Sequence, residues 1–297
     1  MQTLYTIGTF ENEGKPGEEI KILQRHFDQT RQLFIYLTYY LTELARYAET
    51  DAHTRASRRL PTYEDLHVNT KIAGNLVLWK ILEDASFKEF VTKDKAEQLL
   101  DKELMKKLYN ELIEAPEYKT YATKKERDKI EDRNILEFIL ENFLLGKEAF
   151  LSHIDEYFTN WNDDGEMVIQ LLVNYLQKPG SYNFKEMISE DKWNFAKNLL
   201  TAVLEKSEHL QSFIVPKLKN WDPERIALLD MILMKMGVAE FLYFETIPPK
   251  VTINEYIDLA KEYSTPQSGQ FVNGILDNIH KELVKEGKMH KVEFKKA

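Results

Sequence analysis

The chain has 297 residues and carries 40 lysines and arginines against 49 aspartates and glutamates, which gives a formal net charge of −9. This acidic balance argues against a protein held on nucleic acid mainly by bulk charge, although it is compatible with a local basic patch. There is no cysteine, which excludes disulfides, thiolate metal sites and cysteine nucleophiles, and the 11 glycines and 9 prolines are too few for a turn-rich sheet protein.

The start of the chain carries no basic n-region of the kind that opens a signal peptide. The best apolar stretch, Leu33–Leu44, is too short to span a bilayer and is interrupted by Thr38, Thr42 and Glu43. The sequence therefore predicts a cytoplasmic protein, and the absence of cysteine is in keeping with a reducing compartment.

Helical periodicity begins near residue 18. Apolar residues recur at spacings of three, four and seven, namely Ile20, Leu23, Phe27, Phe34, Leu37, Leu41 and Leu44. They predict one long helix over about 18–48, whose aromatic-rich stripe we interpret as core-facing rather than as a binding platform. The polar segment 48–69, with Arg55, Arg58 and Arg59, is predicted to be a solvated connection or lid in preference to a phosphate site.

Further helices are predicted along the rest of the first half, over about 71–82, 93–115, 124–146, 148–161 and 166–177. The run Lys178-Pro-Gly-Ser181 is a strong break in this pattern. We place the main boundary there, which divides the chain into a helical N-terminal region, 1–180, and a C-terminal helical domain, 181–297, with a basic tail.

After the boundary, helices are predicted over about 185–205, 207–220, 223–244, 253–263 and 269–286. Asp222 before Pro223 has the pattern of an N-cap with proline at the first helical position. Thr252 and Glu255 have the spacing of a capping box, Pro248-Pro249 predicts an extended linker, and Ser268 is a candidate cap of the last helix.

A weak internal repeat has a period of sixty residues. Asn160-Trp-Asn-Asp-Asp164 is echoed by Asn220-Trp-Asp-Pro-Glu224. A duplication of helix–helix–tryptophan–helix units and a chance similarity between two amphipathic helix pairs both explain the echo.

Motifs of catalysis are absent from the sequence, which has no GxGxxG after a strand, no GxxxxGK[ST], no HExxH and no GxSxG. The seven histidines show no ligand spacing on one helix. Residues 160–165 imitate the start of a calcium loop, but its twelfth position is Leu171 rather than glutamate, which favours a helix-linking turn. The sequence predicts no enzyme, no metal site and no cofactor.

Polar residues gather near the start of the last predicted helix, where Phe271, Asn273 and Gly274 lie together. A helix N-terminus suits a phosphate, Asn273 can hydrogen-bond a base edge, Phe271 can stack on an unpaired base and Gly274 allows close backbone approach. The alternative interpretation is structural: Phe271 in the core, Asn273 as a buried hydrogen-bonding group and Gly274 as a helix-packing contact.

The same region carries a family resemblance. The ordered series consists of Trp221, Arg225, Ile226, Asp230, Ile232, Leu233, Glu240, Phe241, Pro248, Val251, Ile253-Asn-Glu255, Leu259-Ala-Lys261, Ser268 and Phe271-Val-Asn-Gly-Ile-Leu-Asp277. It resembles the transcription antitermination factor family NusB over about 185–285, and Gln2-Thr-Leu-Tyr5 resembles the QxLY of that family's first helix. The chain then looks like a long variant with an enlarged N-terminal region, in which the first helix can complete the C-terminal domain.

The resemblance implies an all-α helical bundle of NusB type with an additional helical N-terminal region. It further implies an RNA-binding factor that pairs with the small-subunit ribosomal protein acting as Nus factor E, binds single-stranded boxA RNA during ribosomal RNA transcription and joins the elongating RNA polymerase, without catalysis or cofactor. The RNA candidates carried over are Ser268, Gln270, Phe271, Asn273, Gly274, Gln2 and Tyr5. The candidates for the partner-protein surface are Glu240, Thr252 and Glu255.

One feature departs from the family pattern, in which an arginine-rich run that holds RNA phosphate precedes the QxLY helix. Here Gln2 directly follows Met1, so either the true start lies upstream, or the given chain is truncated, or this variant does without the run. A start that lies upstream is the favoured interpretation. The rival to RNA binding is a helical scaffold, in ribosome assembly or transcription complexes, that contacts proteins only. RNA methyltransferases carry a similar helical domain, but only about ten residues follow it here, which disfavours that alternative.

Overall fold

The computed structural model describes residues 1–9, 17–218 and 226–292, and these residues contain helices and no strand. They divide into two compact units, each considered by itself. Unit 1 comprises Met1–Gln24 and Ile188–Ala297, and unit 2 comprises Arg25–Met187. The all-α class predicted from the sequence is confirmed. The sequence boundary at residue 180 lies near the division at 187, and the structure groups residues 1–24 with the C-terminal unit.

The long helix predicted over 18–48 is confirmed as α2, Glu18–Ala56, but it extends further than expected. Residues 48–56 were predicted to be a connection, and that was wrong. No glycine or proline interrupts them before Pro61, and the i,i+4 ion pair between Arg55 and Asp51 joins successive turns. Of the predicted connection, only the part beyond Ala56 leaves the helix, and it holds the single turn α3, Tyr63–Leu66.

Most of the remaining elements of unit 2 are shorter than the periodicity suggested, whereas α10 is longer. They are η1 Lys71–Gly74, α4 Leu76–Glu83, α5 Ala85–Lys93, η2 Ala96–Leu99, α6 Lys102–Leu112, α7 Pro116–Thr123, α8 Lys129–Phe138, the π-helical turn η3 Ile139–Leu144, α9 Glu148–Tyr157, α10 Trp161–Gln177 and η4 Phe184–Glu186. The predicted helices 71–82 and 93–115 are each broken, because Asn75 and Asp101 accept backbone N–H groups and start new helices. Residues 161–165, interpreted as a turn, already lie in α10.

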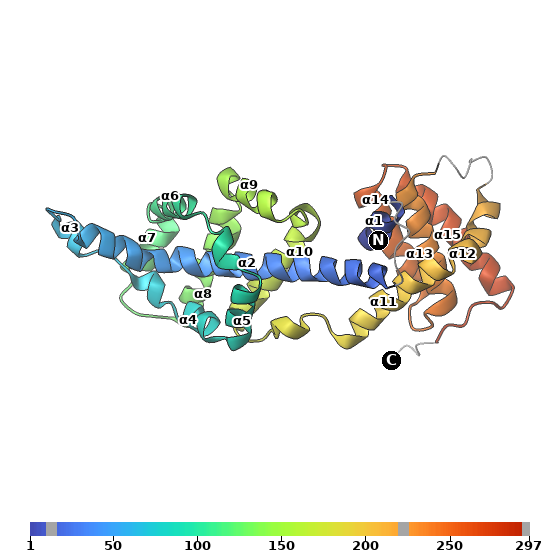
Figure 1. The fold of residues 1–297 in the computed structure, drawn as a ribbon, viewed down its shortest axis with the longest axis horizontal. Coiled ribbons are helices and arrows are strands. Elements are labelled where there is room, and N and C mark those ends of the chain that lie inside the picture. Colours follow the sequence, from blue (N-terminus) through green and yellow to red (C-terminus); the bar gives the residue numbers. More distant parts are fainter. Residues whose placement is uncertain (10–16, 219–225, 293–297) are drawn as a thin grey trace. The chain divides into compact units, whose positions relative to one another are not determined.

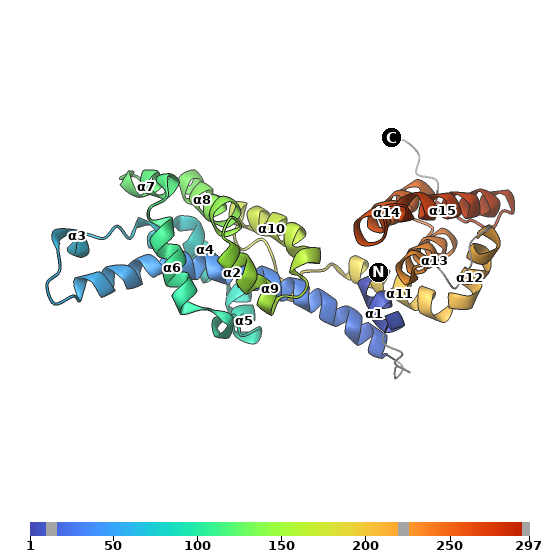
Figure 2. The same ribbon diagram turned by 90° about the horizontal axis from the view of Figure 1, so that it is seen from above.

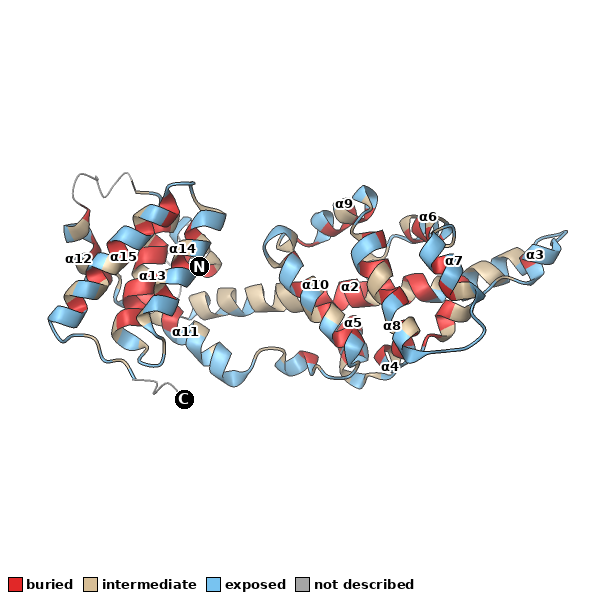
Figure 3. Cartoon of the chain, turned by 180° about the vertical axis from the view of Figure 1, so that it is seen from behind, coloured by how far each residue is buried: buried red, intermediate tan, exposed pale blue. Residues whose placement is uncertain are grey.

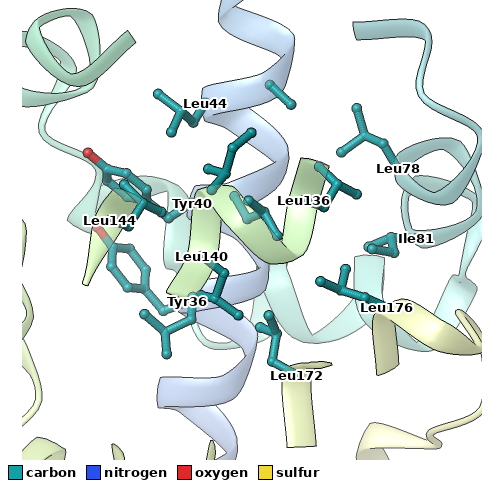
Figure 4. Close-up of a cluster of buried hydrophobic side chains, with 14 of the residues drawn as sticks. Tyr36, Tyr40, Leu44, Leu78, Ile81, Leu136, Leu140, Leu144, Leu172 and Leu176 are labelled. Carbon is teal, nitrogen blue, oxygen red and sulfur yellow. The ribbon is translucent and has the colours of Figure 1, made fainter. Parts of the chain in front are cut away.

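The core of unit 2 surrounds the middle of α2, where residues 33–38 are all buried. Figure 4 shows Tyr36, Tyr40 and Leu44 of α2 among leucines of α8, η3 and α10. A stretch buried on every face leaves no exposed side for ligand binding, so the core-facing interpretation is confirmed for the stripe from Phe34 to Leu44, whereas Ile20, Leu23 and Phe27 are half-buried.

Unit 1 consists of seven helical elements in the described residues and the first turns of α2. They are α1 Gln2–Thr9, α11 Glu190–Glu205, α12 Ser207–Ile214, η5 Val215–Lys217, α13 Leu228–Tyr243, α14 Pro249–Tyr263 and α15 Ser268–Lys285. Helix α13 is the central one: it packs against α1, α11, α12, α14 and α15, and most of it is buried (Figures 1–3).

Gly237 lets the helices of this bundle approach closely. A Cβ atom at this position would lie 2.8 Å from the side chain of Leu276 on α15 and 3.3 Å from Tyr256 on α14. Three helices therefore meet at a point where only a hydrogen atom fits.

Two of the predicted helix starts in unit 1 differ from the structure. Thr252 does not cap a helix, because α14 begins three residues earlier with Pro248 as its N-cap and Pro249 as its first residue. The two prolines thus open the helix instead of forming a linker. Ser268 is the first residue of α15, and no side-chain cap bond starts that helix. Asp222 and Pro223, predicted to start a helix, lie outside the described residues, as does the second half of the sixty-residue echo.

Candidate nucleic-acid interface

The turn between α14 and α15 is built on a buried carboxylate. Asp230, in the first turn of α13, accepts hydrogen bonds from Ser264 Oγ at 2.7 Å and from Ser268 Oγ at 2.8 Å. Ser268 Oγ also accepts the Thr265 N–H at 3.2 Å. These bonds join the start of α13, the end of α14 and the start of α15, and they fix the direction in which α15 leaves the turn.

The first turns of α15 separate buried from exposed side chains. Ser268 is buried, so its hydroxyl serves the Asp230 network and offers nothing to a ligand at the surface. Phe271 is half-buried and packs against the core of unit 1. Gln270 and Asn273 are exposed. The structural interpretation therefore holds in part for Phe271, whereas Asn273 is not a buried hydrogen-bonding group.

Two glycines in this helix have opposite surroundings. A Cβ atom at Gly269 would lie 2.8 Å from the side chain of Lys261, whose carbon chain covers the helix start. A Cβ atom at Gly274 would meet nothing within 4 Å in the described structure. Gly274 is therefore no packing contact there, although a glycine inside a helix costs about 0.5–1 kcal/mol relative to alanine. The helix exposes bare backbone at this point, next to Asn273.

The first helix meets the same end of α13. Helix α1 packs against α13, and the position of a Cβ at Gly8 lies 3.5 Å from the side chain of Leu228 at the start of α13. Tyr5 is 46% exposed, whereas Gln2 is half-buried and has a bonded partner of its own. The candidates on α1 and those on α15 thus belong to helices that both contact the first turns of α13.

The candidates for a partner surface fall into two groups. Glu240 is buried and accepts hydrogen bonds from Thr252 Oγ1 at 2.7 Å and Tyr256 OH at 2.6 Å, which ties α13 to α14. Thr252 is fully buried, so both residues shape the bundle from inside and present no atoms for a partner to touch. Glu255 is exposed and remains the surface candidate.

Burial raises the pKa of Glu240, while its two hydroxyl donors and the nearby Lys291 ammonium act in the opposite direction. Lys291 Nζ donates to the carbonyl oxygens of Glu240 at 2.8 Å and Phe244 at 2.7 Å, where α13 ends. A cation at this position satisfies carbonyls that the helix leaves unpaired and is favoured by the helix dipole.

Sequence reasoning missed the roles of Asp230 and Lys291. Asp230 was noticed only as one member of the family series, and Lys291 was counted as part of a basic tail. The available signal was a lone aspartate in the first turn of an otherwise apolar helix, a position that calls for a hydrogen-bonding partner.

Among the described residues there is no group of three or more histidines, aspartates or glutamates arranged to hold a metal ion. None of the helices in those residues combines the length and apolar character needed to cross a membrane.

The fold and the candidate site define an all-helical domain whose last helix exposes two amide side chains, Gln270 and Asn273, in its first turns. The model of the NusB family matches residues 147–281. Proteins named transcription antitermination protein NusB are similar to this chain: that of Chloroherpeton thalassium is 40% identical over 98 residues, 33% of this chain and 46% of the relative. That of Salinibacter ruber is 42% identical over 98 residues, 33% and 61% of the two chains.

A third relative, the NusB protein of Methylacidiphilum infernorum, is 34% identical over 126 residues, which cover 39% of this chain and 87% of the relative. The chain belongs to the NusB family. Its match spans about half to three-fifths of the first two relatives. No solved structure matches the chain. The family match begins at 147, so it includes α9 and α10 of unit 2 as well as most of unit 1, and two of its pattern residues, Trp221 and Arg225, lie outside the described residues.

Proposed function

We propose that this protein is an RNA-binding transcription antitermination factor. It acts with the small-subunit ribosomal protein that serves as Nus factor E, on boxA-type single-stranded RNA, in the elongation complex of RNA polymerase that transcribes ribosomal RNA. Membership of the NusB family supports the role in antitermination. Binding of the RNA strand and of the two protein partners is the general role of the family, and we assign this role to unit 1.

The observation that carries the proposal is the exposed backbone at Gly274 beside the exposed amide of Asn273. A glycine in mid-helix with open space around it reduces helix stability and gives no packing benefit in return within the described structure. Binding of a phosphate or a base edge would explain a glycine at this position, because the ligand can reach backbone atoms that a side chain would cover. Gln270, one helical turn before Gly274, extends this surface, and Phe271 supports it from the half-buried side. Tyr5 on α1 is a further exposed candidate.

The test is binding of a labelled boxA-like RNA, with and without the ribosomal partner protein, at two salt concentrations. We expect tight binding that needs the partner and that Asn273→Ala weakens about fivefold to tenfold, as for one lost hydrogen bond. Asn278→Ala is the matched control, since Asn278 is an exposed asparagine of the same helix. Equal losses in the two variants would contradict the role of Asn273, and binding of the partner without any RNA binding would favour the protein-only scaffold instead.

A further inference from the structure

Three large side chains, spaced three residues apart, are exposed at one turn of unit 2. We call residues 55–67, which comprise the end of α2, the connection and α3, the α2–α3 tip. Leu60 is 86% exposed, Tyr63 76% and Leu66 56%. Figure 3 colours this end of α3 as exposed. Large apolar side chains gathered at one place on a surface are typical of a binding site.

The tip is a fixed turn. Thr62 Oγ1 accepts the Asp65 N–H at 3.2 Å, and the Asp65 carboxylate accepts the Thr62 N–H at 3.0 Å, which together form a capping box. Asp65 also pairs with Arg58 Nη1 at 2.8 Å, which links the turn back to the end of α2. The exposed side chains are therefore presented by a backbone that is already ordered, so a ligand need not bear the cost of ordering it.

An aromatic pair lies on this turn. The rings of Tyr63 and His67 are stacked, with centroids 4.0 Å apart and planes inclined by 22°. His67 Nδ1 donates to the Tyr63 carbonyl oxygen at 2.8 Å, which holds the imidazole in place. Because most of Tyr63 is exposed, a planar group such as a nucleobase can extend the stack.

A second segment lies beside the tip. It is the α7–α8 loop, residues 124–128. Two side chains that follow the tip in sequence hold the end of α7 and the start of this loop. Asn69 Nδ2 donates to the Ala122 carbonyl at 2.8 Å, and Lys71 Nζ donates to the Lys124 carbonyl at 2.8 Å. Asn69 is two residues from His67, a distance of at most about 7 Å along the chain. The α7–α8 loop thus lies near the aromatic pair.

The two segments and the residues that flank them carry a positive charge on an acidic chain. The tip and the loop themselves contain six lysines and arginines against four aspartates and glutamates, and Lys71, Lys119 and Lys129, the first residue of α8, flank them, whereas the whole chain has a net charge of −9. Arg59, Lys125 and Lys129 are exposed and take part in no ion pair within the part of the chain that the structure describes. Unpaired cations beside an exposed aromatic stack match the two halves of a nucleotide, its phosphate and its base.

We propose that the α2–α3 tip and the α7–α8 loop form a surface for single-stranded nucleic acid in unit 2, separate from the interface on α15. A base stacks on Tyr63, Leu60 and Leu66 flank it, and Arg59, Lys125 and Lys129 contact the phosphates of the neighbouring nucleotides. This surface recognises backbone charge and base planes, so it binds without strong sequence preference.

The test uses the full chain with Asn273→Ala, so that the interface on α15 is weakened, and a labelled 20-nucleotide oligo(U) at several salt concentrations. We expect Arg59→Gln/Lys125→Gln/Lys129→Gln to lower the affinity about tenfold and to reduce the slope of log affinity against log salt by about 2, because each phosphate contact on a single strand contributes about 0.7. Tyr63→Ala is expected to lower the affinity about tenfold without changing this slope.

The matched control is Lys102→Gln/Lys106→Gln/Lys107→Gln on α6, which removes the same charge from exposed lysines of the same unit. It is expected to change the affinity less than twofold, and ultraviolet cross-linking of the oligo(U) is expected to label the peptide that contains Tyr63. Equal losses in the two triple variants, or an affinity that Tyr63→Ala leaves unchanged, overturn the proposal and leave the tip to a protein partner. The experiment reads unit 2 alone, so the interface on α15 can fail its own test without affecting this result.

Discussion

Two buried carboxylates on α13 show how single residues hold unit 1 together. Asp230 accepts bonds from Ser264 and Ser268 near the start of the helix, and Glu240 accepts bonds from Thr252 and Tyr256 near its end. All four donors are hydroxyls, which satisfy a carboxylate's lone pairs without neutralising its charge. Asp230 thereby positions the turn that precedes the candidate interface, and Glu240 fixes the helix pair behind it.

The raised pKa of Glu240 predicts a pH dependence of stability. A carboxyl group whose pKa is higher in the folded than in the unfolded protein binds more protons when folded, so its contribution to stability declines as the pH rises through and above its ordinary range. Glu240→Gln removes this titration. We therefore expect the difference in unfolding free energy, variant minus wild type, to increase between pH 4.5 and about pH 7, because only the wild type loses the contribution of Glu240. Chemical unfolding of both proteins across this range measures the effect.

Glu262→Gln is the control for this pH series. Glu262 lies on the same helix as Thr252 and Tyr256, but it is exposed and is not among the charges that act on Glu240. Its substitution is expected to leave the pH dependence of the wild type nearly unchanged. A Glu240→Gln variant that follows the wild type at every pH would show that burial does not govern this carboxyl group.

At the scale of the elements, α15 illustrates a conflict between helix stability and surface function. Gly237 on α13 faces α15 and is needed for packing, whereas Gly274 on α15 faces open space in the described structure. The same residue type is therefore explained by close contact in one helix and by access to the backbone in the next.

This contrast predicts opposite effects of two alanine substitutions. Gly274→Ala is expected to stabilise unit 1 by about 0.5–1 kcal/mol, because alanine is the better helix former and its methyl group meets no neighbour. The same variant is expected to bind boxA-like RNA several-fold more weakly. Gly237→Ala is expected to destabilise unit 1 by about 1–3 kcal/mol, since Leu276 is fully buried and cannot move aside freely. Thermal unfolding and RNA titration of both variants measure these effects, and a Gly274→Ala protein with unchanged RNA affinity would contradict the proposed role.

Helices that depend on local sequence spacing were predictable, and breaks that depend on contacts between distant residues were not. The long helix around Leu37 and Leu41 and the last two helices, α14 and α15, were evident from local periodicity, because apolar residues repeat at helical spacing along each of them. Helix α13 is buried on nearly every side, so its sequence is mostly apolar. The sequence did not predict the break at Asn75, where one helical element ends and α4 begins. The local pattern is the same for an asparagine that faces solvent within a helix and for one that caps a new helix. Here Asn75 Nδ2 also donates to the carbonyl oxygen of Asp132 at 2.7 Å, a contact 57 residues away that no local pattern contains.

The candidate site was predictable to a similar degree. Asn273 and Gly274 were singled out from residue type and position alone, but exposure decides between a binding and a packing role, and exposure depends on the tertiary fold. For Thr252, the local pattern led to a wrong prediction. Its spacing to Glu255 matched a capping box, yet the hydroxyl bonds a buried glutamate on another helix.

At the scale of the whole molecule, the chain contains two separate hydrophobic cores. One is built around α2 of unit 2 and includes Leu140, and the other is built around α13 of unit 1 and includes Leu233. The two clusters share no buried residue among those described. Because apolar burial supplies most of the driving force for folding, each unit has the means to unfold in its own transition.

Paired core substitutions test this independence. Leu140 and Leu233 are both fully buried, so truncation of either to alanine is expected to cost about 2–5 kcal/mol, the lost burial plus the cavity left behind. Leu140→Ala should lower amide-exchange protection in α8 and α10 while α13 and α15 keep theirs, and Leu233→Ala should do the reverse. Hydrogen exchange read by mass spectrometry on both variants resolves the two units. A loss of protection in all four helices from either substitution would mean that the long helix α2, which contributes residues to both units, couples them into one cooperative structure.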